Sequence, residues 1–282
     1  METLLALPIA LIVLVIGAAI GSFLNVVVYR LPAGMSLVWP PSRCPHCLHR
    51  LRSFENVPVL GWLWLKGRCA RCQQPIAVRY PLVEAATGLL FLLVFFSFGL
   101  SWQTVGGWAF FSWLLALSLI DLDTLTLPNP LTQSGLVAGL GFQLVLGLYQ
   151  TADAGNAIAH LITGDRLMTG GILGAVIGLW LLDGFSVLGA MLFRKPAMGG
   201  GDAKLAAMMG AWLGWKYLLV AGFLACVIGA FGGGGAIALG WVKRHQPIPF
   251  GPALALGAAI ALLWGETILS AYLQLFFPTI GF

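Results

Sequence analysis

Long apolar runs separated by short polar stretches occupy most of the chain, and this pattern predicts membrane-spanning helices. The first run covers residues 4–28, and the only substantial polar segment follows it at 30–80. Further apolar runs lie near 83–100, 103–120, 131–149, 169–193, 217–242 and 250–276, with a shorter helix near 203–214. About 20 apolar helical residues suffice to cross a bilayer. We therefore expect an all-α polytopic membrane protein with about eight transmembrane helices.

A secretory signal peptide is the alternative for the first apolar run. The run has no basic segment before it, it is too long, and no small-residue cleavage site leads into a secreted domain. We therefore expect a true first span at 1–29. It is followed by a cytoplasmic loop domain at 30–81 and a membrane domain at 82–282.

Composition supports a lipid environment. Hydrophobic residues make up 59% of the 282 positions and charged residues only 9%, against about 25% charged residues in soluble domains. So few charges cannot cover the surface of a water-soluble fold of this size. The 37 glycines suit close packing between membrane helices.

The distribution of basic residues predicts the orientation in the membrane. Eight of the 15 Lys and Arg residues lie between Arg30 and Arg79. A nucleic-acid partner is one interpretation of such a cluster, but basic loops of membrane proteins concentrate on the cytoplasmic side. With eight crossings every basic cluster falls on that side, and both termini lie outside together with a loop expected at 150–168. We expect a lipid bilayer and no nucleic acid as partner.

Two Cys-x-x-Cys pairs, Cys44-Pro-His-Cys47 and Cys69-Ala-Arg-Cys72, predict a metal site in the polar loop. Each pair presents two thiolates on one side of a turn, and two such turns complete a tetrahedral zinc site. Bound metal would also stabilise a loop too small to have much core of its own. Disulfides or redox pairs are the alternatives, which a reducing cytoplasm disfavours. His46 and His49 are the substitute ligands.

Asp202 closes the glycine-rich segment Met198-Gly199-Gly200-Gly201-Asp202. Gly199 and Gly201 would permit turns that other residues avoid, and would let a substrate backbone approach closely. Such an approach suits a peptidase that acts on a membrane-anchored segment. An ordinary helix N-cap explains the aspartate equally well, because Asp is a favoured cap and a helix follows.

Asp121 ends an apolar span, and Pro128 and Pro130 stop the helix from continuing. It could be a solvated interfacial residue, or could bind a divalent cation together with Asp123. The third interpretation is an aspartyl dyad with Asp202, since the predicted topology puts both at cytoplasmic ends of spans. In such a dyad adjacent carboxyls share a proton. The ionised carboxyl takes a proton from water while the protonated one binds the peptide carbonyl.

Several segments together resemble the bifunctional prepilin peptidases, also called type IV leader peptidases, which belong to the GxGD aspartic peptidases. The blocks appear in family order across nearly the whole chain. Besides the two Cys-x-x-Cys pairs, they are Gly21–Val27, Phe54–Pro58, Arg79–Glu84, Ser118–Asp121, Gly199–Asp202 and Pro247–Pro252.

The resemblance implies two activities. Family members cleave the basic leader of type IV prepilins and of secretion pseudopilins after a Gly, and then methylate the new amino terminus with S-adenosylmethionine. By position, Asp121 and Asp202 would be the catalytic pair, acting at the cytoplasmic face of a bacterial inner membrane. The metal ligands implied in the domain linked to methylation are Cys44, Cys47, Cys69 and Cys72, holding Zn²⁺.

The methyl-transfer site is harder to place, because no Rossmann-type glycine loop follows a strand. The candidates flank the polar loop at the membrane surface, and structural roles explain each of them equally well. They are Asn25, Glu55, Arg79 and Glu84.

Two features depart from the family pattern: the length of the segment 150–168, and an acid at Asp183, for which no role is evident. Glu266 is likewise an acid within an apolar run. Three other functions stay open from the residues. They are a peptidase whose zinc loop only docks substrate, an ion transporter using the acids in and beside the spans, and a zinc-regulated scaffold.

Overall fold

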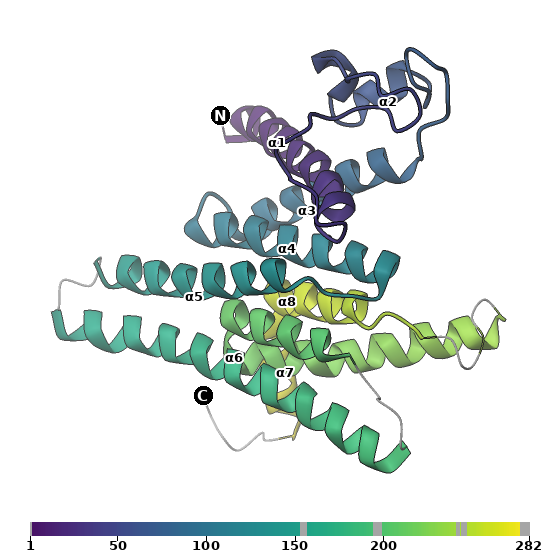
Figure 1. Ribbon diagram of the computed structural model, residues 1–282. Coiled ribbons are helices and arrows are strands. Elements are labelled where there is room, and N and C mark those ends of the chain that lie inside the picture. The colour runs from purple at the N-terminus through teal and green to yellow at the C-terminus, as the bar shows by residue number, and fades with distance from the viewer. Residues whose placement is uncertain (1, 153–156, 194–198, 241–242, 244–246, 277–282) are drawn as a thin grey trace. The chain divides into compact units, whose positions relative to one another are not determined.

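The computed structural model describes residues 2–152, 157–193, 199–240, 243 and 247–276. In these residues the fold is helical, with two isolated β-bridges. The elements are α1 (Glu2–Arg30), η1 (Ser53–Asn56), α2 (Leu60–Trp64), α3 (Arg79–Phe98), α4 (Trp102–Thr124), α5 (Asn129–Ala152), α6 (Ala157–Phe193), α7 (Gly200–Ala238) and α8 (Gly251–Phe276) (Figure 1). Seven helices of the described ranges are long and apolar enough to cross a membrane. The predicted all-α membrane fold is confirmed.

The helix α7 contains two of the expected segments, which is why seven long helices stand where about eight were expected. Gly214 interrupts α7 with φ 73° and ψ 167°, a conformation that is essentially restricted to glycine. The part before Gly214 packs on α6, where Gly210 lies against Gly174. The part after it packs on α8, where Ala221 lies against Gly257. The two parts run in opposite directions (Figure 1).

The prediction of a loop at 150–168 is wrong. In the structure α5 ends at Ala152 and α6 begins at Ala157, so helix occupies most of this segment. No proline occurs between Ala157 and Phe193, and apolar residues are frequent from the start of that range. The sequence between Ala157 and residue 169 therefore contains no proline that would confine α6 to the apolar run starting at 169.

The chain divides into two compact units, Met1–Ala116 and Leu117–Phe282, with the boundary inside α4. In the first unit α1 and α3 pack through glycine: a Cβ on Gly17 would stand 2.8 Å from the Gly88 Cα. Small residues permit this close approach between membrane helices. The predicted division into 1–29, 30–81 and 82–282 stays a prediction.

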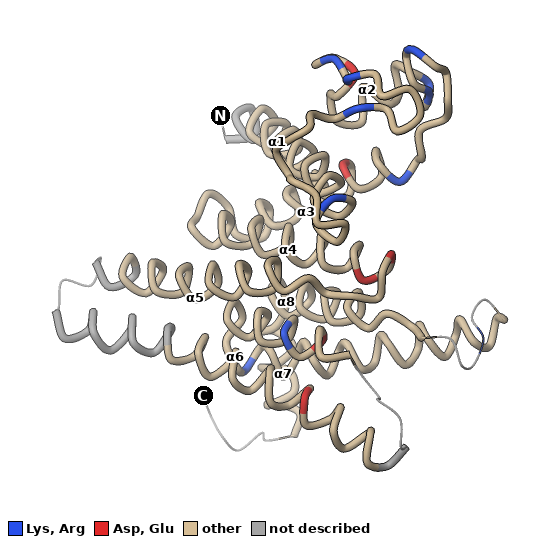
Figure 2. The backbone as a smooth tube through the Cα atoms, in the orientation of Figure 1, with Lys and Arg blue, Asp and Glu red and all other residues tan. Residues whose placement is uncertain are grey.

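The polar loop between α1 and α3 contains η1, α2 and both cysteine pairs, and Lys and Arg gather on it (Figure 2). Several side-chain hydrogen bonds help to hold this loop together. The Val59 N–H donates to Oε2 of Glu84 on α3 at 2.7 Å, and the Trp62 indole N–H donates to the Ile76 carbonyl at 3.1 Å. The first of these ties the start of α2 to α3.

The second unit has its core around the first part of α7. Leu205, Met208 and Met209 are completely buried there. At the end of this part, the side-chain amide of Gln143 on α5 donates to the Trp212 carbonyl at 2.6 Å. Gln143 therefore satisfies a carbonyl in the last turn before Gly214, where the helix leaves carbonyls without a backbone partner.

Candidate functional site

Asp121 and Asp202, which the sequence predicts as neighbours, lie together in the second unit. Asp121 is in the last turn of α4 and Asp202 in the first turn of α7, and their carboxyl groups are close enough to interact electrostatically. Their exposed fractions are 5% and 9%. The fold thus buries two carboxyl groups within electrostatic reach of each other, at the ends of helices from distant parts of the chain.

Gly251, the first residue of α8, completes this pair. Its backbone N–H donates to Oδ2 of Asp121 at 2.9 Å. A Cβ at this position would stand 2.6 Å from the same oxygen, which is closer than real Cβ contacts. Sequence reasoning did not single out Gly251 as a site residue. Its only signal was its place within the resembling segment Pro247–Pro252.

The glycines before Asp202 have different surroundings. A Cβ on Gly201 would stand 3.0 Å from the Leu127 side chain, so this position is tight. Gly199 is extended, with φ −75° and ψ 142°, and a Cβ there would meet only the Gly201 nitrogen at 4.0 Å. Around Gly200 there is open space. The backbone ahead of Asp202 is therefore accessible, although the turn itself does not demand glycine at Gly199.

Three other acids in or beside the spans are not buried as the pair is. Asp123, Asp183 and Glu266 are exposed, whereas Asp121 and Asp202 are buried. Within the described residues, the only group of three or more His, Cys, Asp or Glu side chains able to hold a metal is the cysteine cluster. The predicted cation site at Asp121 and Asp123 therefore lacks a third acidic or histidine ligand among these residues.

The four cysteines of the polar loop form a candidate metal centre. The Sγ atoms of Cys44, Cys47, Cys69 and Cys72 all lie within 4.8 Å of one another. The Cys44 and Cys72 sulfurs are 3.7 Å apart, and the Cys47 and Cys69 sulfurs 3.9 Å. Four sulfurs at about 2.3 Å from a tetrahedral zinc would lie roughly 3.8 Å apart. The donor set therefore fits zinc, and His46 and His49 are not part of it.

The two cysteine turns repeat each other at an offset of 25 residues. The Cys44 N–H donates to the His49 carbonyl and the Leu48 N–H to the Cys44 carbonyl. The same bonds recur from Cys69 to Gln74 and from Gln73 to Cys69. Leu48 and Gln73 take the left-handed conformation, with φ 57° and 59°. Each turn directs two sulfurs to one side, as the spacing predicted.

The pKa values of the thiols indicate that the cluster requires a cation. Backbone N–H groups of Cys72 and Arg71 lower the pKa of Cys69 to about 7. At Cys72 the Gln74 backbone acts in the same direction, but burial and three neighbouring sulfurs outweigh it and raise the pKa to about 12. One thiolate therefore forms readily and disfavours the next, so a cation is needed to stabilise several at once.

The four methyl-transfer candidates occupy the first unit, and three have identified backbone partners. The Asn25 amide donates to the Tyr80 carbonyl at 3.2 Å, and Glu84 accepts from Val59. Glu55 accepts from the Arg52 N–H at 2.8 Å. Arg79 is the first residue of α3, and it too interacts with another group of the protein. Asn25 and Glu84 therefore have clear structural roles.

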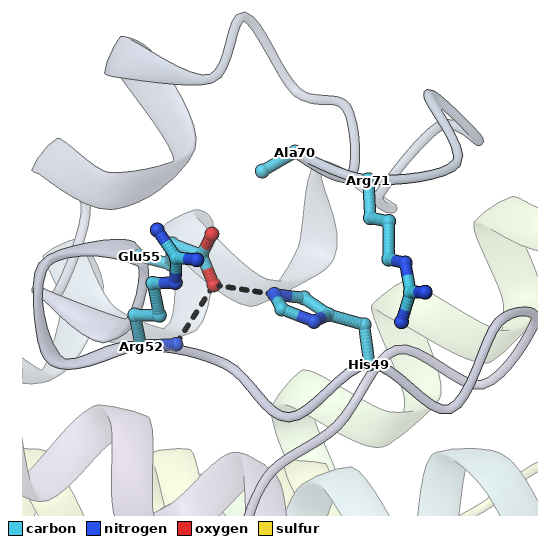
Figure 3. Close-up of a pocket in the computed structure, with 5 residues that line it drawn as sticks. All are labelled: His49, Arg52, Glu55, Ala70 and Arg71. Atoms are coloured by element: carbon cyan, nitrogen blue, oxygen red, sulfur yellow. Dashed lines mark hydrogen bonds and ion pairs between the residues drawn. The ribbon is translucent and has the colours of Figure 1, made fainter.

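Glu55 differs because it lines a pocket. The pocket has a volume of about 380 Å³ and is lined by His49, Arg52, Glu55, Ala70 and Arg71 (Figure 3). His49 Nε2 lies 3.5 Å from Oε2 of Glu55. Of the four candidates, Glu55 alone is in this pocket.

Comparisons with known proteins cover nearly the whole chain. The model of the Bacterial Peptidase A24 N-terminal domain matches residues 15–98, and that of the Type IV leader peptidase family matches residues 108–234. A relative from Aeromonas hydrophila, named prepilin leader peptidase/N-methyltransferase, is 40% identical and aligns over 91% of both chains. Relatives of the same name from Stutzerimonas stutzeri and Pseudomonas aeruginosa are 39% and 38% identical. They align over 97% and 95% of this chain and 97% and 94% of their own. No solved structure matches the chain.

Proposed function

The chain belongs to the type IV leader peptidase family, and on that premise we propose that it cleaves the leader of type IV prepilins and pseudopilins after a Gly, using Asp121 and Asp202. The family makes it a peptidase with methyltransferase activity. Its long apolar helices agree with a multi-pass protein of the inner membrane. The identified relatives carry prepilin leader peptidase in their names, which supports prepilins as the substrate class.

The burial of the two aspartates together is the observation that carries this proposal. Carboxyl groups at the ends of membrane helices are costly to bury, so two buried ones that lie near enough to interact electrostatically are expected to serve function. Gly251 supplies one hydrogen bond to Asp121, which fixes the orientation of that carboxyl. The N-cap of α7 is Gly199 and not Asp202, which lies inside the first turn, so capping explains neither the burial of this acid nor its two neighbours.

The pair supports hydrolysis by general acid–base catalysis. One carboxylate takes a proton from a water molecule, whose oxygen then forms a bond to the scissile carbonyl carbon. The other carboxyl, protonated, donates a hydrogen bond to the carbonyl oxygen. The C–N bond then breaks as the departing amine receives a proton. The open backbone at Gly199 and Gly200 would admit the unwound substrate segment.

We assign the methylation to the first unit. Cys44, Cys47, Cys69 and Cys72 would hold Zn²⁺, and a closed site of four cysteines serves structure. S-adenosylmethionine would supply the methyl group for the new amino terminus when bound. The polar loop would form the surface on which the amine and the donor meet.

The orientation follows from the same charge distribution that the sequence displays. Basic residues gather on the polar loop (Figure 2), and basic loops favour the cytoplasmic side. We therefore place the aspartate pair and the zinc loop at the cytoplasmic face. The leader would reach the site from that face, while the apolar helix of the substrate stays in the bilayer.

The test is a mass spectrum of a type IV prepilin incubated with the purified protein and S-adenosylmethionine. Wild type is expected to release the leader after Gly and to add one methyl group. Asp121→Asn and Asp202→Asn are each expected to lower cleavage by about a hundredfold to ten-thousandfold, since general acid–base groups contribute roughly 10² to 10⁴. Asp123→Asn, an exposed neighbour on α4, is the matched control.

Cleavage that persists in either buried variant would contradict the dyad. Cleavage without methylation in wild type would leave a peptidase whose zinc loop has another role.

A further inference from the structure

The pocket beside the cysteine cluster combines side chains of opposite charge. Arg52 and Arg71 approach it from opposite sides, with His49 and Glu55 between them (Figure 3). The Glu55 side chain is 4% exposed. A carboxylate so deeply buried needs fixed partners, because an unpaired buried charge is costly.

The contacts of Glu55 fix its position and leave capacity for a ligand. The Arg52 N–H and His49 Nε2 both meet the same oxygen, Oε2, at 2.8 and 3.5 Å. In Figure 3 the other oxygen carries neither of these contacts. A carboxylate can accept several hydrogen bonds. These contacts hold Glu55 through Oε2, and its other oxygen can accept a hydrogen bond from a further donor.

This arrangement favours a zwitterion over a simple anion. A guanidinium binds a carboxylate in a two-pronged manner, and a carboxylate binds an ammonium group. The two arginines would attract a phosphate, but the negative charge of Glu55 would repel it. An α-amino acid group presents both charges on neighbouring atoms and fits both.

We propose that this pocket binds the amino-acid end of S-adenosylmethionine, with Arg52 and Arg71 holding the carboxylate and Glu55 the ammonium. The assignment rests on the proposed methyl transfer. The pocket volume of about 380 Å³ falls within the range of small-molecule sites.

The proposal also explains why a metal site stands beside the pocket. Ala70 and Arg71 are the two residues between Cys69 and Cys72. Metal binding by these cysteines fixes the turn, and with it the point from which Arg71 reaches into the pocket. The zinc centre then supports the donor site without touching the donor.

The test measures binding to the full-length protein in detergent by calorimetry, with two ligands. S-adenosylhomocysteine has the amino-acid end, and 5′-methylthioadenosine is the same nucleoside thioether without it. Arg52→Gln, Arg71→Gln and Glu55→Gln are each expected to weaken S-adenosylhomocysteine about tenfold and to leave 5′-methylthioadenosine unchanged. Arg68→Gln is the matched control, because Arg68 also adjoins a cysteine of the cluster but does not line the pocket.

Three results would overturn the assignment. In the first, all variants bind S-adenosylhomocysteine as wild type does. In the second, both ligands weaken equally, which indicates a structural effect. In the third, Glu55→Gln strengthens binding, which indicates a site for a simple anion. Wild type that cleaves prepilin but neither methylates it nor binds either ligand would refute the proposed methyl transfer itself, and the pocket assignment with it.

Discussion

At the scale of single residues, Gly251 shows how an absent side chain can orient a functional group. Its N–H reaches Oδ2 of Asp121 at 2.9 Å only because no Cβ fills the space between them. The contact spans 130 positions of sequence. A methyl group at Gly251 must push the carboxyl aside or push α8 away from α4.

We expect Gly251→Ala to lower prepilin cleavage by about a hundredfold, because a displacement of the reacting group of about 1 Å has that effect. Leader release measured by mass spectrometry checks this. Gly222→Ala, at a helical glycine with open space around it, is expected to cleave as wild type does. If Gly251→Ala also retains full cleavage, the hydrogen bond to Asp121 has no part in catalysis.

The sequence made some of these residues predictable and others not. Apolar runs that end in an acid located Asp121, and a glycine-rich segment located Asp202. The partner Gly251 could not be inferred from spacing, because the sequence does not show which of its 37 glycines lies against a distant side chain. The pocket residues Arg52 and Arg71 had no distinguishing signal among the other arginines of the polar loop.

At the scale of elements, the break inside α7 depends on a side chain from another helix. Gly214 stops the helix, and the Trp212 carbonyl finds its donor in Gln143 on α5. Trp212 in turn donates from its indole to the Gly135 carbonyl at 2.8 Å. Both contacts are buried, so the break is closed by polar groups that water does not reach.

We expect Gln143→Leu to reduce stability by about 1–3 kcal/mol, because it leaves a buried carbonyl without its donor. Thermal unfolding in detergent measures this. Gln133→Leu makes the same change at an exposed position of the same helix and is expected to have little effect. Equal melting temperatures for wild type and Gln143→Leu would contradict the role given to the amide.

Apolar periodicity predicted the existence of the helices better than their ends. The run that begins near 169 marked the most apolar part of α6 but not its first turn at Ala157. Helix boundaries depend on caps and breakers, and no strong stop signal lies between these two points. The break in α7 was anticipated near 214, where a short helix was expected to end.

At the scale of the whole chain, the two candidate centres belong to different compact units. The cysteine cluster and its pocket lie in Met1–Ala116, and the aspartate pair lies in Leu117–Phe282. If each activity depends on its own unit, damage to one need not abolish the other.

We therefore expect Cys47→Ser with Cys72→Ser to remove bound zinc and lower methylation more than about tenfold, since ligand loss unfolds small metal-stabilised domains. Cleavage should change by less than about twofold. Metal analysis and product mass measure the three quantities. Cys226→Ser, at an exposed cysteine outside the cluster, is the control. Loss of cleavage in parallel with methylation would show that the two units do not act separately.

The short first part of α7 has a consequence for how the protein is made. Gly200–Leu213 is only about 20 Å long at 1.5 Å per residue, whereas the hydrocarbon core is about 30 Å thick. The insertion machinery of the cell recognises longer apolar segments, so this part cannot enter the bilayer alone. It must insert into the bilayer together with the part of α7 beyond Gly214, as one helical hairpin. Asp202 would then reach Asp121 only after α7 has left the ribosome, and a nascent chain would carry no complete peptidase before that point.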